Sequence, residues 1–288
     1  MPSYGIAILY TLFIWWFSTG VILYLDGLPK HTFRWSMLGA TALLAWSLYG
    51  LAATSMDTSV TGAYLAFTYA MFVWGWQEMS FLMGYVTGPR QTPCPTGSRG
   101  WRRARYALET IFYHEIALVV SMLVVLAVTW GGSNQVGKWT FLILWVMRLS
   151  AKLNVFLGVR NLYEEFLPDN LRYLHSYFTR KSMNALFPVV VTLSSVVAFY
   201  LWRHAFASEA SAFQTTGASF LATLLTLAII EHGFLVLPIP ATALWTWGLR
   251  SRAKRESNYT GGKQADRSVP FELAAAEPVR AHTARPGC

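Results

Sequence analysis

Three carboxylates in this sequence of 288 residues, Glu78, Glu115 and Glu231, stand inside long apolar stretches. A further apolar stretch carries two cations four residues apart, Arg148 and Lys152. A charged side chain at the centre of a membrane helix costs roughly 2.5–3.5 kcal/mol on insertion scales, so counter-charges must lie on neighbouring helices. We therefore expect the two cations to meet the three carboxylates as ion pairs inside a helical bundle.

Uncharged polar side chains accompany these charges. His114 directly precedes Glu115, and His232 directly follows Glu231. Neighbouring helical residues point about 100° apart, so one member of each pair faces the cluster while the other orients it or contacts a different helix. The sequence does not decide which. The complete candidate set, for ligand binding or for a buried ion network, is Glu78, His114, Glu115, Arg148, Lys152, Asn154, Asn161, Asn184, Glu231 and His232.

Carboxylates and imidazoles are the usual ligands of iron and zinc, which makes a metal site one interpretation. Its candidate ligands are Glu78, His114, Glu115, Glu231 and His232. The Glu-x-x-His spacing of di-iron helical bundles is absent, and so are the HxxxH and HxxHH patterns of membrane hydroxylases. The neighbouring cations would also repel a metal ion, which counts against this interpretation.

Two interpretations need no iron or zinc. In the first, the charges form a structural network in which a protonated histidine or glutamate absorbs the one surplus negative charge. In the second, the cluster binds an amphipathic, partly anionic ligand. Arg148 or Lys152 would then pair with its carboxylates, and His114 or His232 would ligate a central Mg²⁺. The sequence leaves both open.

Composition places the cluster in a membrane. Hydrophobic residues make up 54% of the chain and charged residues 13%, against about 25% charged in an ordinary soluble domain. The formal charge of +9 resides mainly in short loops between apolar runs of membrane-spanning length, a distribution that favours a membrane protein over a nucleic-acid-binding one. The two cysteines, Cys94 and Cys288, have no spacing typical of a disulfide framework or a metal site.

The apolar runs predict an all-α, polytopic integral membrane bundle of about seven transmembrane helices within residues 1–250. A short run, Ala241–Leu249, is too brief to cross and is expected at the membrane interface. Residues 251–288 are polar and basic and are predicted to be a disordered cytoplasmic tail. The seven predicted spans are Tyr4–Leu25, Trp35–Thr54, Val60–Gly84, Tyr106–Trp130, Lys138–Gly158, Met183–Trp202 and Gly217–Leu237.

The distribution of Lys and Arg predicts the orientation of these spans. The first, third and fifth loops and the segment after the last span are basic, whereas the other loops carry none, Lys138 alone and Arg203 alone. The positive-inside rule then places the N-terminus outside and the C-terminus in the cytoplasm. In this orientation, the polar residues of all five spans that carry them fall in the cytoplasmic third of the bilayer, which predicts one shared polar site.

Helical spacing refines this prediction for the fifth span. Arg148 and Lys152 share one face, and a second stripe holds Asn154, Gly158, Asn161 and Glu165. In the fifth loop, the spacing of Leu171, Leu174 and Phe178 predicts a short amphipathic helix that lies on the membrane.

Several strings in the chain, in order between Tyr4 and Arg250, resemble those of a known family. They are Trp15–Gly20, Trp74–Glu78, Gly88–Arg90, Tyr113–Glu115, Arg148–Asn154, Phe156–Asn161, Glu165–Pro168 and Glu231–His232. The family is PuhE, whose members are photosynthetic complex assembly proteins of purple and other aerobic phototrophic proteobacteria. The resemblance implies a role in assembling the reaction centre and light-harvesting apparatus in the bacterial inner membrane, tied to bacteriochlorophyll supply. It brings no established catalytic residues.

Three functions are therefore compared. The first is an inner-membrane assembly factor that handles bacteriochlorophyll, another tetrapyrrole or pigment–protein intermediates. Its partners would be membrane lipids and reaction-centre, light-harvesting or pigment-synthesis proteins, without nucleic acid. The second is a membrane metalloenzyme that uses iron or zinc to oxidise or hydroxylate a tetrapyrrole or quinone. The third is a transporter or channel, but the outer half of the spans has no matching polar groups to continue a path. Whether the protein is an enzyme stays open.

Overall fold

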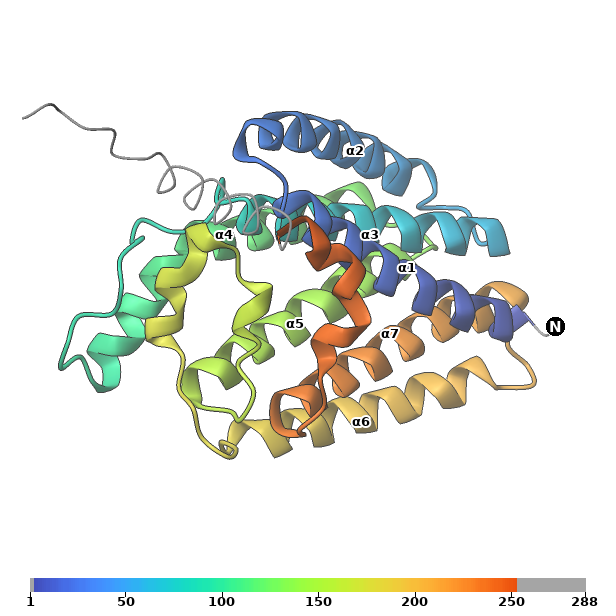
Figure 1. Cartoon of the computed structure of the whole chain (residues 1–288). Helices are drawn as coiled ribbons and strands as arrows, with labels where there is room; N and C mark the ends of the chain where they lie inside the picture. Colours follow the sequence, from blue (N-terminus) through green and yellow to red (C-terminus); the bar gives the residue numbers. More distant parts are fainter. Residues whose placement is uncertain (1–2, 253–288) are drawn as a thin grey trace, which may run out of the picture.

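The computed structural model describes residues 3–252, and this part of the chain is helical (Figure 1). Its only β-type pairing is an isolated bridge between Val159 and Arg180. Short 3-10 helices cover Lys30–Thr32 (η1), Glu164–Phe166 (η2), Asp169–Tyr177 (η3) and Ala241–Trp245 (η4). The long helices are α1 Ser3–Asp26, α2 Phe33–Ala53, α3 Val60–Leu82, α4 Gly100–Val128, α5 Val136–Leu157, α6 Leu186–Ala205 and α7 Ala212–Val236.

The prediction of an all-helical protein with several membrane-length helices is confirmed. Six of the described helical segments, those that contain α1, α2, α4, α5, α6 and α7, are long and apolar enough to cross a membrane. The remaining helix, α3, has 23 residues but is not among them. Its tyrosines and tryptophans, together with Gln77 and Glu78, lower its mean hydropathy.

Burial shows that α3 and α7 form the centre of the bundle. These two helices contribute 13 and 14 buried residues, whereas α6 contributes only Ala198 and Ala205. α3 contacts α2, α5 and α7, and α7 also contacts α1, α5 and α6. In Figure 1, α2 and α6 lie on opposite sides of the bundle. The peripheral helices expose large apolar side chains such as Trp46 and Phe199, as expected for surfaces in contact with lipid.

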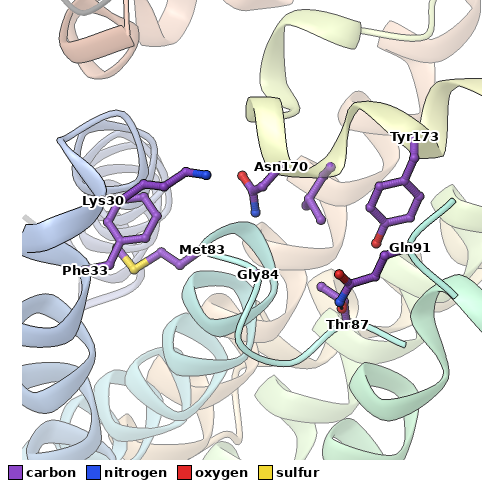
Figure 2. A pocket seen from close by; sticks show the side chains of 9 residues that line it. Lys30, Phe33, Met83, Gly84, Thr87, Gln91, Asn170 and Tyr173 are labelled. Atoms are coloured by element: carbon purple, nitrogen blue, oxygen red, sulfur yellow. Dashed lines mark hydrogen bonds between the residues drawn. The ribbon is translucent and has the colours of Figure 1, made fainter. Parts of the chain in front are cut away.

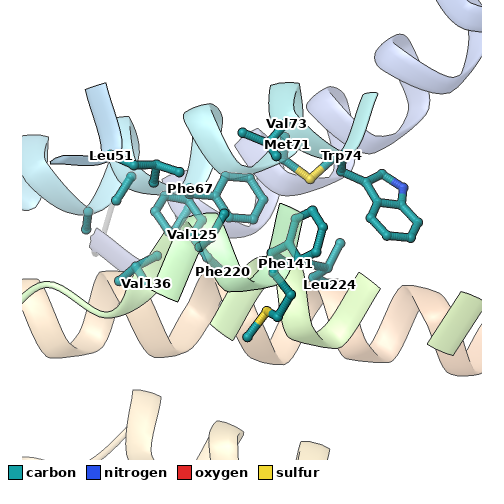
Figure 3. Close-up of a cluster of buried hydrophobic side chains, with 14 of the residues drawn as sticks. Leu51, Phe67, Met71, Val73, Trp74, Val125, Val136, Phe141, Phe220 and Leu224 are labelled. Carbon is teal, nitrogen blue, oxygen red and sulfur yellow. The ribbon is translucent and has the colours of Figure 1, made fainter. Parts of the chain in front are cut away.

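An apolar core fills the half of the bundle that lacks the candidate polar residues (Figure 3). Phe67 of α3 stacks on Phe220 of α7 with ring centroids 4.5 Å apart. Trp74 of α3 meets the edge of Phe141 of α5 at 5.6 Å. Aromatic pairs of this kind add to the stabilisation from apolar burial. The three inner helices are therefore held in a fixed arrangement before any polar contact is considered.

Two expectations about α5 and the loop after it are corrected. α5 ends at Leu157 because Gly158 has φ 124°, a backbone conformation that stops the helix and favours glycine. Asn161 and Glu165 therefore do not continue the helical stripe of Asn154, and the predicted second stripe is wrong beyond Gly158.

The predicted amphipathic helix of the fifth loop exists as the 3-10 helix η3. Its Leu171 and Leu174 are buried in a cluster with Phe81 and Leu82 at the end of α3. The apolar side that was expected to lie on the membrane therefore packs against the protein. The helix α4 also differs from its predicted span, since it starts at Gly100, six residues earlier than Tyr106.

The segment after α7 returns along α1. η4 leads into a short helical segment, residues 246–252, that ends at Arg252. The indole nitrogen of Trp245 donates to the carbonyl of Trp16 at 3.0 Å, and Gly20 and Gly248 permit close contact of the two backbones. Residues 253–288, where the sequence predicts a disordered tail, lie outside the described residues.

Candidate functional site

Two ion pairs join α5 to its neighbours at the end of the bundle that carries the basic loops. Arg148 lies 2.8 Å from the carboxylate of Glu78 on α3. One turn further along α5, the ammonium of Lys152 lies 2.7 Å from the carboxylate of Glu115 on α4. The second pair is well buried, with 19% and 17% of the two side chains exposed, whereas Arg148 is 45% exposed. The predicted meeting of cations and carboxylates is present for these four residues.

The adjacent residues Glu231 and His232 face different helices. His232 is buried, and its two ring nitrogens lie 2.9 Å from the hydroxyl of Ser150 on α5 and 2.8 Å from the carbonyl of Ala228. Glu231 is exposed and accepts a 2.8 Å hydrogen bond from the indole of Trp15 on α1. Of this pair, His232 contacts α5 and Glu231 contacts α1.

Asn154 and Asn184 connect the end of α5 to the start of α6. The Asn184 amide donates to the Asn154 side-chain oxygen at 2.9 Å and to the carbonyl of Gly158 at 2.9 Å. The oxygen of the same Asn184 side chain accepts from the backbone N–H of Leu186 at 2.9 Å. One side chain thus satisfies free backbone groups at a helix C-terminus and at a helix N-terminus.

Asn161 performs a similar task for α7. Its backbone N–H donates to the carbonyl of Leu235 at 2.9 Å, and its side-chain amide donates to the carbonyl of Phe234 at 2.8 Å. The hydroxyl of Tyr163 donates to the same Phe234 carbonyl. Tyr163 has a φ of 45°, an uncommon left-handed conformation for a tyrosine. The segment after α5 is therefore shaped to close the C-terminal end of α7.

His114 differs from the other candidates. It is fully buried on α4, its ring lies 4.6 Å from the ring of Phe81, and neither ring nitrogen has a hydrogen-bond partner among the described residues. Its neighbour Glu115 forms the ion pair with Lys152, so the two residues point to different surroundings.

Nine of the ten candidates therefore make polar contacts within the protein. We call these nine, together with Ser150 and Trp15, the α5 polar network, because most of the contacts involve α5 or the loop after it. The sequence did not identify Ser150 or Trp15, although both lie in strings that carry the family resemblance. It also missed Asp26 at the end of α1, which is fully buried and accepts two hydrogen bonds from one nitrogen of Arg252 at 2.7 and 2.8 Å.

A metal centre finds no support in this arrangement. Within residues 3–252, no three His, Cys, Asp or Glu side chains lie close enough together to hold a metal ion. Among the five candidate ligands, two carboxylates pair with cations, Glu231 binds an indole, and both nitrogens of His232 are engaged. His114 is buried among protein atoms.

Without a metal centre, the site consists of ion pairs and hydrogen bonds that hold the helices together, plus two polar residues at the protein surface. The Arg148 side chain is 45% exposed and Glu231 is an exposed residue, on the part of the bundle where α7 contacts α5 and α1. Ionisable groups within apolar helices of membrane-spanning length mark a site of function by default.

Comparison with known proteins gives the family of this chain. No solved structure matches it. A curated protein of Rhodobacter capsulatus, described as "Uncharacterized 30.4 kDa protein in puhA 5'region", is 40% identical over 248 residues, which cover 84% of this chain and 89% of that protein. The family profile described as "Protein of unknown function (DUF3623)" matches residues 1–256. A match of this length includes every candidate residue, and the chain belongs to the DUF3623 family.

Proposed function

We propose that this protein is an inner-membrane assembly factor for the bacterial photosynthetic apparatus, which acts on reaction-centre or light-harvesting intermediates. The observation that carries the proposal is the relative from Rhodobacter capsulatus, whose description places it in the 5' region of puhA. That location associates the family with photosynthesis genes. The similarity to PuhE in strings such as Arg148–Asn154 supports the more specific assembly role.

The proposal includes seven membrane spans with the N-terminus outside and the C-terminus in the cytoplasm. Six helices have the length and hydropathy of spans. α3 would be the seventh, because 23 residues of helix extend about 34 Å, enough for a hydrocarbon core of ~30 Å. Its polar residues suit this placement, since α3 is central and most of Glu78 is covered by protein. The alternation of basic and non-basic loops supports the orientation.

In this proposal the α5 polar network is a structural core and not a catalytic centre. The two ion pairs fix α5 against α3 and α4, and the asparagines fix the ends of α5, α6 and α7. This rigid frame presents Arg148 and Glu231 at the surface, where they can pair with polar groups on a membrane-embedded partner. When a protein intermediate with a polar group inside the membrane binds here, Arg148 or Glu231 supplies the counter-charge that lipid cannot supply.

The test uses a phototrophic proteobacterium from which the gene has been deleted. Absorption spectra of its membranes report the amounts of assembled reaction centre and light-harvesting complex. We expect both to fall, and to recover with the wild-type gene. A Glu231→Gln variant that accumulates normally but restores assembly poorly would support a partner-facing role for this carboxylate. Ser208 lies outside the network, and Ser208→Ala serves as the control that restores assembly fully.

Affinity purification of the tagged protein from the same membranes provides the second readout. The proposal predicts that reaction-centre, light-harvesting or pigment-synthesis proteins co-purify with it. Normal spectra in the deletion strain together with the absence of these partners would refute the proposal.

A further inference from the structure

A pocket of about 140 Å³ lies outside the α5 polar network, at the end of the bundle where α2 begins and α3 ends (Figure 2). Three separate segments line it. Lys30 of η1 and Phe33 at the start of α2 form one segment, Met83 and Gln91 come from the segment after α3, and Tyr173 comes from η3. This volume is well below the ~300–1,000 Å³ of pockets for drug-sized ligands, so it excludes a tetrapyrrole and suits a small group.

The pocket offers several hydrogen-bond donors and no carboxylate. None of the nine residues that line it is acidic, and Lys30 forms no ion pair with any described residue. Figure 2 shows the Lys30 ammonium directed toward Asn170. The hydroxyl of Tyr173 is buried and faces Thr87 without forming a regular hydrogen bond with it. Burial raises the pKa of Tyr173 above its ordinary value, which keeps this hydroxyl protonated.

Two amide side chains are held in position at the same pocket. The amide nitrogen of Asn170 donates to the carbonyl of Leu82 at 3.1 Å, and that of Gln91 donates to the hydroxyl of Thr87 at 3.1 Å. Each amide nitrogen keeps a second hydrogen for another acceptor. One ammonium, two oriented amides and one buried hydroxyl form a donor set that matches a phosphate group, whose oxygens accept several charge-assisted hydrogen bonds.

The position of the pocket indicates the source of the phosphate. Phe33 and Met83 supply apolar walls, and the neighbouring α2 exposes the large apolar side chains of Trp35 and Leu38. The basic loops lie at this end of the bundle, so the pocket would be at the level of the inner-leaflet headgroups. A basic residue near an anionic leaflet is attracted to its headgroups. We propose that the pocket binds the phosphate group of an anionic membrane phospholipid.

The test measures lipid affinity of the full-length protein, purified in detergent and stripped of lipid. A ligand that binds only the folded state raises the melting temperature, and the rise with concentration yields an apparent Kd. Three probes are compared: short-chain phosphatidylglycerol, phosphatidylcholine with the same acyl chains, and inorganic phosphate. We expect phosphatidylglycerol to stabilise the protein most, phosphatidylcholine to do so weakly and inorganic phosphate not at all.

Variants of the lining residues test whether the stabilisation by phosphatidylglycerol arises from binding in this pocket. Loss of a hydrogen bond to a charged group corresponds to about a tenfold change in affinity, so Lys30→Gln should weaken phosphatidylglycerol binding about tenfold. Tyr173→Phe removes only the hydroxyl and should weaken it to a smaller degree. Lys138→Gln makes the same charge change at the other end of the bundle and should have no effect.

Two results would overturn the proposal. One is an unchanged phosphatidylglycerol affinity in both Lys30→Gln and Tyr173→Phe. The other is equal stabilisation by phosphatidylcholine or by inorganic phosphate, which would show that a net anionic lipid is not what the pocket recognises. Because the readout is binding by the purified protein, neither result depends on a role in photosynthetic assembly.

Discussion

Arg148 on α5 and Glu78 on α3, 70 positions apart in the chain, are joined by a 2.8 Å ion pair in which the carboxylate is mostly covered and the guanidinium is not. One helical turn away, Lys152 and Glu115 form a pair that is covered on both sides. The two ion pairs use the same helix, α5, but different partner helices, α3 for Arg148 and α4 for Lys152. Their different exposure predicts that the two cations contribute unequally to stability.

Lys152→Met should destabilise the protein more than Arg148→Leu does. Removing one partner of a buried pair costs on the order of 3–5 kcal/mol because the other charge stays buried without compensation. Both substitutions leave a mostly covered carboxylate, but the 45% exposed guanidinium of Arg148 makes a more strongly screened ion pair, so less stabilisation is lost when it is removed. Thermal unfolding in detergent and protein levels in membranes measure the difference.

The double variant Glu115→Gln/Lys152→Met provides the control for this prediction. With both charges removed, no unpaired carboxylate remains, so the double variant should regain much of the stability lost in Lys152→Met. If the two single losses simply add in the double variant, Lys152 and Glu115 are not coupled as the structure indicates.

The two buried histidines should respond in opposite ways to the same substitution. His232→Leu removes contacts with Ser150 and with the carbonyl of Ala228 and should cost about 1–3 kcal/mol. His114→Leu replaces a buried imidazole whose nitrogens have no partner among the described residues, so it should be neutral or stabilising. Melting temperatures of the two variants test this pair of outcomes. Strong destabilisation by His114→Leu would reveal a partner for that ring that the structure does not show.

Arg252→Gln should release the segment that returns along α1. Arg252 is 11% exposed and pairs with the fully buried Asp26, and it also donates to the carbonyl of Glu165 at 2.7 Å. Its loss leaves a buried carboxylate without its cation. Hydrogen exchange in residues 241–252 should increase strongly. Arg250 is exposed, and Arg250→Gln should leave exchange unchanged; a similar increase in both variants would contradict the pairing.

Gly158→Ala should lower stability by about 1–2 kcal/mol, because φ 124° is unfavourable for any residue with a Cβ. The added atom would also lie 2.8 Å from the Lys181 side chain. Gly39→Ala is the matched control, since a Cβ there meets nothing within 4 Å and alanine favours the helix. Equal melting temperatures for the two variants would show that the turn after α5 adapts without cost.

The helices were largely predictable from the sequence, because each long apolar run has no other way to satisfy its backbone in lipid. The ends of the helices were less predictable. The predicted α5 stripe extends to Glu165 because Asn161 and Glu165 have helical spacing, but periodicity does not register a glycine that leaves the helical conformation. α4 starts earlier than predicted because Arg102, Arg103 and Arg105 are good helix formers although they are not apolar.

The candidate site was predictable in its members but not in its pairing. Charges inside apolar runs identified Glu78, Glu115, Arg148 and Lys152, because their isolation in the sequence is itself the signal. Which carboxylate meets which cation depends on how α3 and α4 pack around α5, and one sequence contains no such information. The pairing of Asp26 with Arg252 was missed for a related reason, since both residues stand at the edges of apolar runs, where charges are ordinary.

The order of the paired residues along the chain has a consequence for biosynthesis. Glu78 and Glu115 both precede Arg148 and Lys152, so in the proposed topology a nascent chain carries each carboxylate into the membrane before the cation that pairs with it. The helix with two positive charges is thus the third of the three to leave the ribosome. Its insertion can be assisted by neighbours already present beside the translocon, and the reverse order would leave both cations without partners at that moment.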